Sequence, residues 1–195
     1  TSETEEAVFS YVATLERLLE RLPARSREIV KLRFGVPDGK IRTLEEIGKR
    51  YGITRERVRQ VVGSALAMIA SHKEYPEVIE IMRHIEQALG SRSGVMKVDH
   101  LVEKLAGRDK AERGALSVFL ESLPVCGTEK ENDDREKVCF LNGFLFSEWK
   151  DIHDTVIEVL KESKSALSLE DLYTLFSKRV EGFSQDRLLH FLLVS

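Results

Sequence analysis

The chain has 195 residues, enough for one or two domains with hydrophobic cores of their own. It carries 30 Lys and Arg against 33 Asp and Glu, a net charge of −3, and 42% of its residues are hydrophobic. This composition is typical of a soluble globular protein and excludes a disordered chain. No apolar run reaches the roughly 20 residues that a membrane-spanning helix needs, so we expect a cytoplasmic protein with no membrane partner.

The sequence contains no pattern typical of catalysis or metal binding. Cys126 and Cys139 are too few for a disulfide framework or a four-ligand zinc site. We expect two buried, reduced thiols, although the pair could also face each other across two strands. The histidines have no metal-ligand spacing, and there is no nucleophile–base motif or glycine-rich phosphate loop. We therefore predict a protein that is not an enzyme and has no cofactor, metal or catalytic residue.

In chain order, apolar residues at helical spacing predict an opening amphipathic helix within residues 1–22, ended by Pro23. A second helix begins after Pro23, and Gly35 is placed to end it. A turn is expected at Pro37-Asp38-Gly39.

Two short helices are then expected, each preceded by a threonine at the N-cap position, Thr43 and Thr54. The glycine-containing turn Tyr51-Gly52-Ile53 lies between them, so the segment has the pattern of a helix-turn-helix. Gly48, inside the first of these helices, would allow the two helices to cross closely.

Charge is distributed unevenly along the chain. Residues 24–60 contain 11 Lys and Arg against 5 Asp and Glu, a net charge of +6, which leaves −9 for the remainder. A basic segment attached to an acidic remainder is typical of binding to a phosphate backbone.

The second short helix has residues suited to reading DNA bases. Val58 and Val62 lie on its apolar side, and the opposite face carries arginine, glutamate and glutamine, which pair with guanine, cytosine and adenine edges. The predicted base-reading residues are Arg55, Glu56, Arg59 and Gln60. Arg57 lies to the side, where a phosphate contact is expected. The alternative is an ordinary solvated charged face.

A long ordered set of residues resembles region 4 of housekeeping-type bacterial RNA polymerase sigma factors. The set consists of Leu22-Pro23, Arg33-Phe34-Gly35, Arg42-Thr43-Leu44-Glu45-Glu46-Ile47-Gly48 and Thr54-Arg55-Glu56-Arg57-Val58-Arg59-Gln60. The resemblance implies that the second helix enters the major groove of a −35 promoter element and that the module docks on the flap of the polymerase β subunit. It also implies a bacterial, nucleoid-associated protein.

The resemblance also assigns roles to individual residues. Base reading is implied for Arg55, Glu56 and Gln60, whereas Arg59, which the helix face places among the base readers, is a backbone contact in the family. The predicted contacts to the DNA backbone are Arg33, Arg42, Thr43, Leu44, Lys49, Thr54 and Arg57.

The sequence departs from the family after the second helix. Residues 62–70 are apolar where the family has further basic residues, so we expect this segment to pack against a following domain. The parts of a sigma factor that bind core polymerase and melt the promoter are absent. From about Ile85 the chain is not sigma-like.

The second half of the chain contains a repeat with an offset of about 71 to 72 residues. Residues 98–101 and 116–120 match residues 169–172 and 188–192. The stretches Val125–Thr128 and Val138–Phe146 predict a two-stranded wing after the first copy. The two units are weakly similar to winged helix-turn-helix modules of the HARE type. The second copy stops at Ser195 within a predicted helix, so we expect the chain to be a piece of a longer protein.

The expected recognition helices of these units, near Ala111–Ser122 and Ser184–Val194, contain few basic residues. Protein–protein packing is therefore favoured for them over phosphate contact.

Together these features predict a mainly α protein in which a sigma-region-4-like helix-turn-helix is followed by two winged-helix-like units, the second truncated. The expected domains are residues 1–22, 23–70, 71–146 and 147–195. The predicted function is sequence-specific binding of promoter-like double-stranded DNA in transcription, with contact to RNA polymerase and a possible protein partner on the winged-helix-like units. Two alternatives stay open: a docking module without base reading, and the DNA-targeting part of a larger restriction or nuclease protein.

Overall fold

The computed structural model describes residues 9–92, 94–129, 137–142, 146–163 and 165–194. The opening helix, expected within residues 1–22, is observed as α1 (Tyr11–Leu19), and the Ser10 hydroxyl accepts a hydrogen bond from its first turn. Helix α2 (Ala24–Phe34) follows Pro23. It ends at Gly35, whose φ of 70° is the left-handed conformation that favours glycine at a helix end. Both predicted ends of α2 are therefore confirmed.

The expected pair of short helices is α3 (Leu44–Tyr51) and α4 (Arg55–Ser71). Helix α4 has 17 residues, so the expectation of a short helix is wrong for it, although the apolar line Val58, Val62, Ala65 and Ile69 predicts helical spacing over this length. It continues past residue 62 because the chain contains no proline until Pro76 and because its apolar side, through Ala65 and Ile69, is buried over the whole length.

A second unit, built from helices and a small β-sheet, follows α4. It consists of α5 (Pro76–Gly90), β1 (Val95–Lys97), α6 (Val98–Ala106), α7 (Lys110–Ser122), β2 (Cys126–Glu129) and β3 (Val138–Leu141). The strands form an antiparallel sheet in the order β1-β3-β2, with Val95 opposite Phe140 and Thr128 opposite Cys139. This arrangement of three helices and a small sheet is winged-helix-like.

Two details of the predicted wing are wrong. Strand β1 was not predicted, because three residues are too few to show an alternating pattern. The strand expected to reach Phe146 ends at Leu141, and Phe146 instead begins helix α8 (Phe146–Glu162).

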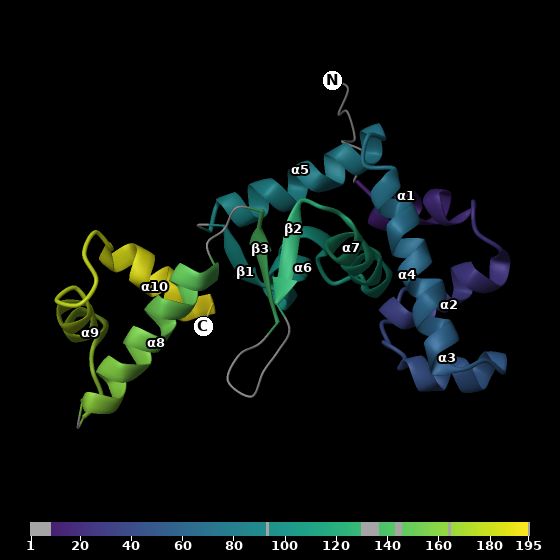
Figure 1. The fold of residues 1–195 in the computed structure, drawn as a ribbon. Coiled ribbons are helices and arrows are strands. Elements are labelled where there is room, and N and C mark those ends of the chain that lie inside the picture. Colours follow the sequence, from purple (N-terminus) through teal and green to yellow (C-terminus); the bar gives the residue numbers. More distant parts are fainter. Residues whose placement is uncertain (1–8, 93, 130–136, 143–145, 164, 195) are drawn as a thin grey trace, which may run out of the picture.

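The last unit contains α8, α9 (Leu169–Phe176) and α10 (Gln185–Val194). The repeat is visible in its packing, since Leu101 and Leu116 of the first copy and Leu172 and Leu188 of the second are all buried. These helices have a core of their own, with Phe176 fully buried in it. Figure 1 shows α8, α9 and α10 on the far side of the sheet from α1–α4.

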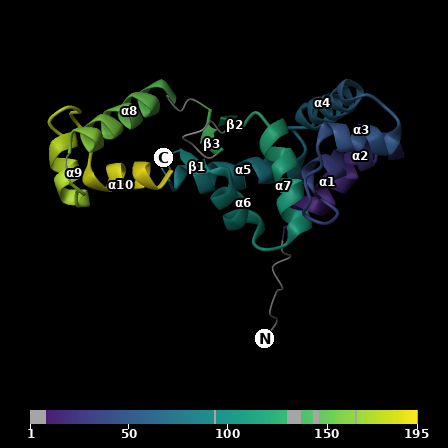
Figure 2. The ribbon, with the colours of Figure 1, turned by 90° about the horizontal axis from the view of Figure 1, so that it is seen from below.

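Helix α7 lies at the centre of the larger core, which extends from Tyr11 to Cys139. It packs against α1, α2 and α4 on one side and α6 on the other, an arrangement that can be followed in Figure 2. Gly114 permits this approach, because a Cβ on it would lie 2.8 Å from the Phe34 carbonyl oxygen and 2.9 Å from the Val36 nitrogen. The apolar side of α4 thus packs against the following unit, as expected, and the core crosses the expected boundary between residues 70 and 71.

Cys126 and Cys139 are buried, as predicted, and form no disulfide. Contact with Cys126 and burial raise the pKa of the Cys139 thiol above its usual value, so this thiol stays protonated at neutral pH.

Within the described part of the chain, no helix is both long and apolar enough to cross a membrane. The same residues contain no group of three or more His, Cys, Asp or Glu side chains that could hold a metal ion.

Candidate nucleic-acid interface

The two helices of the helix-turn-helix are positioned by their threonine caps. In α3 the Thr43 hydroxyl accepts from the Glu46 amide at 3.1 Å, and the Thr43 amide donates to the Glu46 carboxylate at 2.7 Å. This reciprocal capping box holds the pKa of Glu46 below its usual value. In α4 the Thr54 hydroxyl accepts from the Arg57 amide at 3.1 Å. The N-caps predicted at Thr43 and Thr54 are confirmed.

The turn between α3 and α4 is tight because residue 48 has no side chain. A Cβ on Gly48 would lie 2.6 Å from the carbonyl oxygen of Ile53, a contact that real structures do not show. Gly52 closes α3 in the left-handed conformation, with a φ of 63°. Gly48 is therefore the residue that lets the start of α4 lie directly against α3, as the sequence predicts.

We expect Gly48→Ala to lower the free energy of unfolding by about 1–2 kcal/mol, because the overpacking cost against Ile53 exceeds the roughly 1 kcal/mol that alanine gains in helix propensity. Urea unfolding followed by circular dichroism measures the difference. Gly63→Ala is the matched control, because Gly63 is also helical and a Cβ there meets nothing within 4 Å. The control should be stabilised, and a stabilised Gly48→Ala would contradict the role of this contact.

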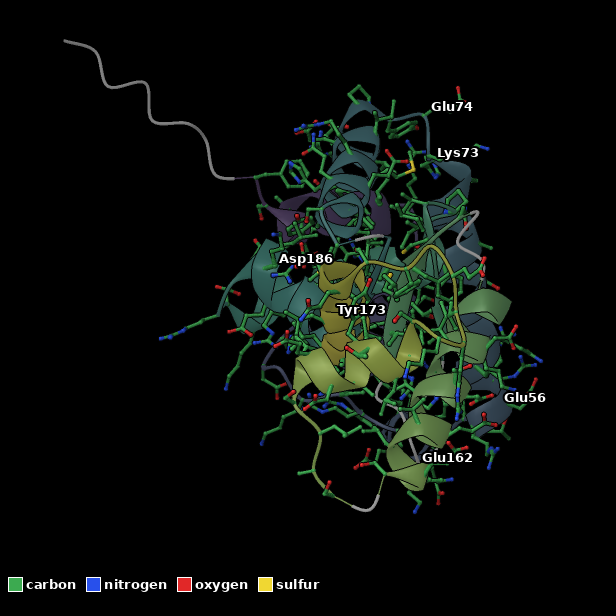
Figure 3. All side chains as sticks on the ribbon, turned by 90° about the vertical axis from the view of Figure 1, so that its left-hand side faces the viewer. Glu56, Lys73, Glu74, Glu162, Tyr173 and Asp186 are labelled. Atoms are coloured by element: carbon green, nitrogen blue, oxygen red, sulfur yellow. The ribbon has the colours of Figure 1, made fainter. Side chains whose placement is uncertain are left out.

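The exposed face of α4 carries the four predicted base-reading residues. Val58, Val62 and Ala65 are buried on the side that packs against the core. Arg55, Glu56, Arg59 and Gln60 are all exposed in the first turns, as is Arg57 beside them. Figure 3 shows Glu56 at the edge of the molecule. The face is therefore free to approach a DNA groove.

Contacts within this face order three of the four side chains. Arg59 donates two hydrogen bonds to the Glu56 carboxylate, at 2.9 and 2.7 Å, which hold the pKa of Glu56 below its usual value. Arg57 donates to the Gln60 side-chain oxygen at 3.3 Å. The Gln60 side chain also hydrogen-bonds to the Glu56 carboxylate and helps to lower the pKa of Glu56. Among the described residues Arg55 has no hydrogen-bond or ion-pair partner. Arg55 is thus the cation on this face most readily available to a base.

The predicted phosphate contacts surround the start of α3. Arg33 donates to the Arg42 carbonyl oxygen at 2.9 Å, which ties α2 to the residues before α3. Arg42 pairs with Asp38, whose pKa it holds well below the usual range, and Lys49 pairs with Glu45 at 2.9 Å. The Lys49–Glu45 pair is exposed and therefore weak, so a phosphate can replace Glu45 at little cost. The Arg42–Asp38 pair is bidentate, so a phosphate at Arg42 must compete with Asp38.

Leu44 can contribute a phosphate contact only through its backbone. Its side chain packs against the core, but its N–H is the first of α3 and has no acceptor within the part of the chain that the structure describes. Free N–H groups at a helix N-terminus are suited to an anion.

A cluster of side chains that was not predicted from the sequence fixes α2 to the end of α3. Arg25 donates to the Tyr51 carbonyl oxygen and lies over the Tyr51 ring, 5.5 Å from its centroid. The Tyr51 hydroxyl donates to Glu28 at 2.7 Å, and burial, with Glu28, raises the pKa of Tyr51. The residues of this cluster are 23 or more positions apart, so no local sequence pattern predicts their contact. The one available signal was the aromatic side chain of Tyr51 at the end of α3.

The sequence model of the family described as sigma-70, region 4 matches residues 18–69, a range that contains α2, α3 and nearly all of α4. Residues 18–69 are a sigma-70 region 4 domain. The chain is also similar to the RNA polymerase sigma factor SigA of a Bacillus species, with 52% identity over 52 residues. The matched segment is 27% of this chain and 14% of that relative, so the chain spans a small part of the relative's length.

A sigma-70 region 4 domain is a DNA-binding helix-turn-helix domain associated with RNA polymerase and promoter recognition. In this chain it is joined to a winged-helix-like unit through the shared core around α7.

Proposed function

We propose that this chain binds double-stranded DNA sequence-specifically at promoter-like sites, with the first turns of α4 in the major groove. The observation that supports this most directly is the exposed face of α4, where arginine, glutamate and glutamine side chains stand together on a helix-turn-helix domain of the sigma-70 region 4 family. Arg55, the Glu56–Arg59 pair and Gln60 read base edges in this proposal.

The surrounding residues position the domain on the DNA backbone. Arg33, Arg42 and Lys49 supply positive charge, and the α3 N-terminus supplies the Leu44 N–H. The remaining contacts proposed are Thr43, Thr54 and Arg57. Such contacts fix register and orientation but carry no sequence information themselves.

Contact with RNA polymerase is the second part of the proposal. The relative is named an RNA polymerase sigma factor, and the flap of the β subunit is the docking site we propose for this domain. Helix α7 already covers one side of α1, α2 and α4, so the flap must use another side of the domain. Outer faces of the winged-helix-like units are the proposed site for a further protein partner.

Selection of bound sequences from random duplex DNA, with core polymerase present and absent, tests the function. We expect a defined consensus, and binding that weakens steeply as salt rises because phosphate contacts release counterions. Recovery of no consensus in either condition would overturn base reading, and salt-independent binding would overturn the phosphate contacts.

Substitution of the base-reading residues provides a sharper measurement. Arg55→Ala and Gln60→Ala should each weaken binding to the selected site by about 1–3 kcal/mol and relax specificity at one position. Lys73→Ala and Gln87→Ala are matched controls, because both side chains are exposed and Lys73 lies well away from Glu56 (Figure 3). Unchanged binding in both test variants would show that α4 does not read bases.

A further inference from the structure

A cleft of about 560 Å³ lies where the sigma-70 region 4 domain meets the winged-helix-like unit. Its walls come from the end of α2, the loop between α2 and α3, and helices α6 and α7. The charged residues that line it are Arg33, Arg108, Lys110, Arg113, Lys137, Asp99 and Glu121. Five cations therefore face two carboxylates in a chain whose overall charge is negative.

Three of the cations are not neutralised by the protein. Lys137 pairs with Glu121 at 2.8 Å, and Arg33 donates to the Arg42 carbonyl oxygen. Arg108, Lys110 and Arg113 have no ion-pair or side-chain hydrogen-bond partner among the residues that the structure describes. Lys110 and Arg113 are three positions apart on α7 and so share one face of that helix. The uncompensated charge is concentrated at the start of α7.

The cleft is continuous with the proposed DNA-backbone contacts. Arg33 belongs to both sets, since it lines the cleft and holds the Arg42 carbonyl. The Lys110 side chain lies against the loop that leads to Arg42, because a Cβ on Gly39 would stand 2.8 Å from the Lys110 Cδ. Lys110 therefore lies beside the loop that carries Arg42 and leads to α3.

We propose that this cleft is a second phosphate-backbone site, in which Arg108, Lys110 and Arg113 hold the DNA that extends beyond the element read by α4. The inference rests on the proposed function. It gives the winged-helix-like unit a role in binding DNA through the turn before α7, while the apolar side of α7 is buried against α1, α2 and α4. The three cations are spread along a turn and one helix face, an arrangement that suits a polyanion with regularly repeated charges. Arg33 belongs both to the cleft and to the proposed DNA-backbone contacts, which favours DNA over an acidic peptide as the ligand.

The experiment compares the complete chain with the variant Arg108→Gln/Lys110→Gln/Arg113→Gln on the selected duplex and on versions extended at either end by about one helical turn, roughly 10 base pairs. The wild type should bind one extended duplex more tightly than the short one, and the variant should lose that gain. On the extended duplex the salt dependence of the variant should be shallower by about 2–3 in the slope of log K against log salt, at about 0.9 for each lost phosphate contact.

The matched control is Arg92→Gln/Lys104→Gln/Lys150→Gln, which removes the same charge from exposed positions outside the cleft. Circular dichroism verifies that both variants fold. If Arg55→Ala weakens binding while the cleft variant keeps the wild-type slope and extension gain, the cleft inference fails and the proposed function stands. If the wild type binds no duplex, both fail. If the variant loses only binding to core polymerase, the cleft is a protein site and the inference is overturned.

Discussion

Phe119→Ala is expected to lower the free energy of unfolding by about 3–5 kcal/mol, the cost of removing a large aromatic side chain from a packed core. Phe119 is fully buried on α7. Because α7 packs against α1, α2 and α4 as well as α6, the loss should reach the helix-turn-helix and the winged-helix-like unit together. Urea unfolding measures the size of the effect, and hydrogen exchange read by mass spectrometry measures its location.

Phe176→Ala is the matched control for this prediction. Phe176 is also fully buried, but it belongs to the separate core of α8, α9 and α10. Phe119→Ala should speed exchange in both residues 11–69 and residues 76–141, whereas Phe176→Ala should speed it in residues 146–194. If Phe119→Ala leaves residues 11–69 with wild-type protection, the sigma-70 region 4 domain folds independently of α7.

Gly114→Val is expected to destabilise the chain by about 3 kcal/mol, at the upper end of the cost of overpacking. The added side chain would meet backbone atoms of Phe34 and Val36 within 3 Å, and backbone cannot rotate out of the way as a flexible side chain can. To relieve the clash, α7 must move away from the end of α2. Arg33 at the end of α2 would then move away from Lys110 and Arg113 on α7. Binding to the extended duplex should therefore weaken as well.

Gly63→Val serves as the control, because Gly63 lies within α4 and a Cβ at that position would meet nothing within 4 Å. Valine and glycine differ by only a few tenths of a kcal/mol, roughly, in helix propensity, so the stability of this variant should hardly change. Thermal unfolding compares the two. Equal stability of both variants would show that α7 does not need to approach α2 closely.

The local structure of the helix-turn-helix was predictable because its signals are local. Thr43 and Thr54 cap helices through bonds that span three residues, and Gly35 and Gly52 end helices through their own backbone conformation. The alternation of buried valines and exposed charges on α4 follows from helical periodicity alone. These features identify the positions of the candidate base-reading residues without any knowledge of the rest of the fold.

Strand β1 and the length of α4 were harder to predict. A strand of three residues is defined by its partner, here Val138–Phe140 of β3, more than 40 positions away. The continuation of α4 past residue 62 depends on a second surface, that of α7, covering its apolar side. Neither partner is visible in a short sequence window.

The amino-acid sequence was sufficient to identify the sigma-70 region 4 domain, its caps, its turn and the separation of a basic segment from an acidic remainder, because each depends on residues close together in the chain. Only the packed fold shows that this domain shares a core with the next unit through Gly114. The packed fold also places Arg108, Lys110 and Arg113 beside Arg33. Packing joins residues about 80 positions apart in these cases, and no local propensity encodes which distant surfaces will meet.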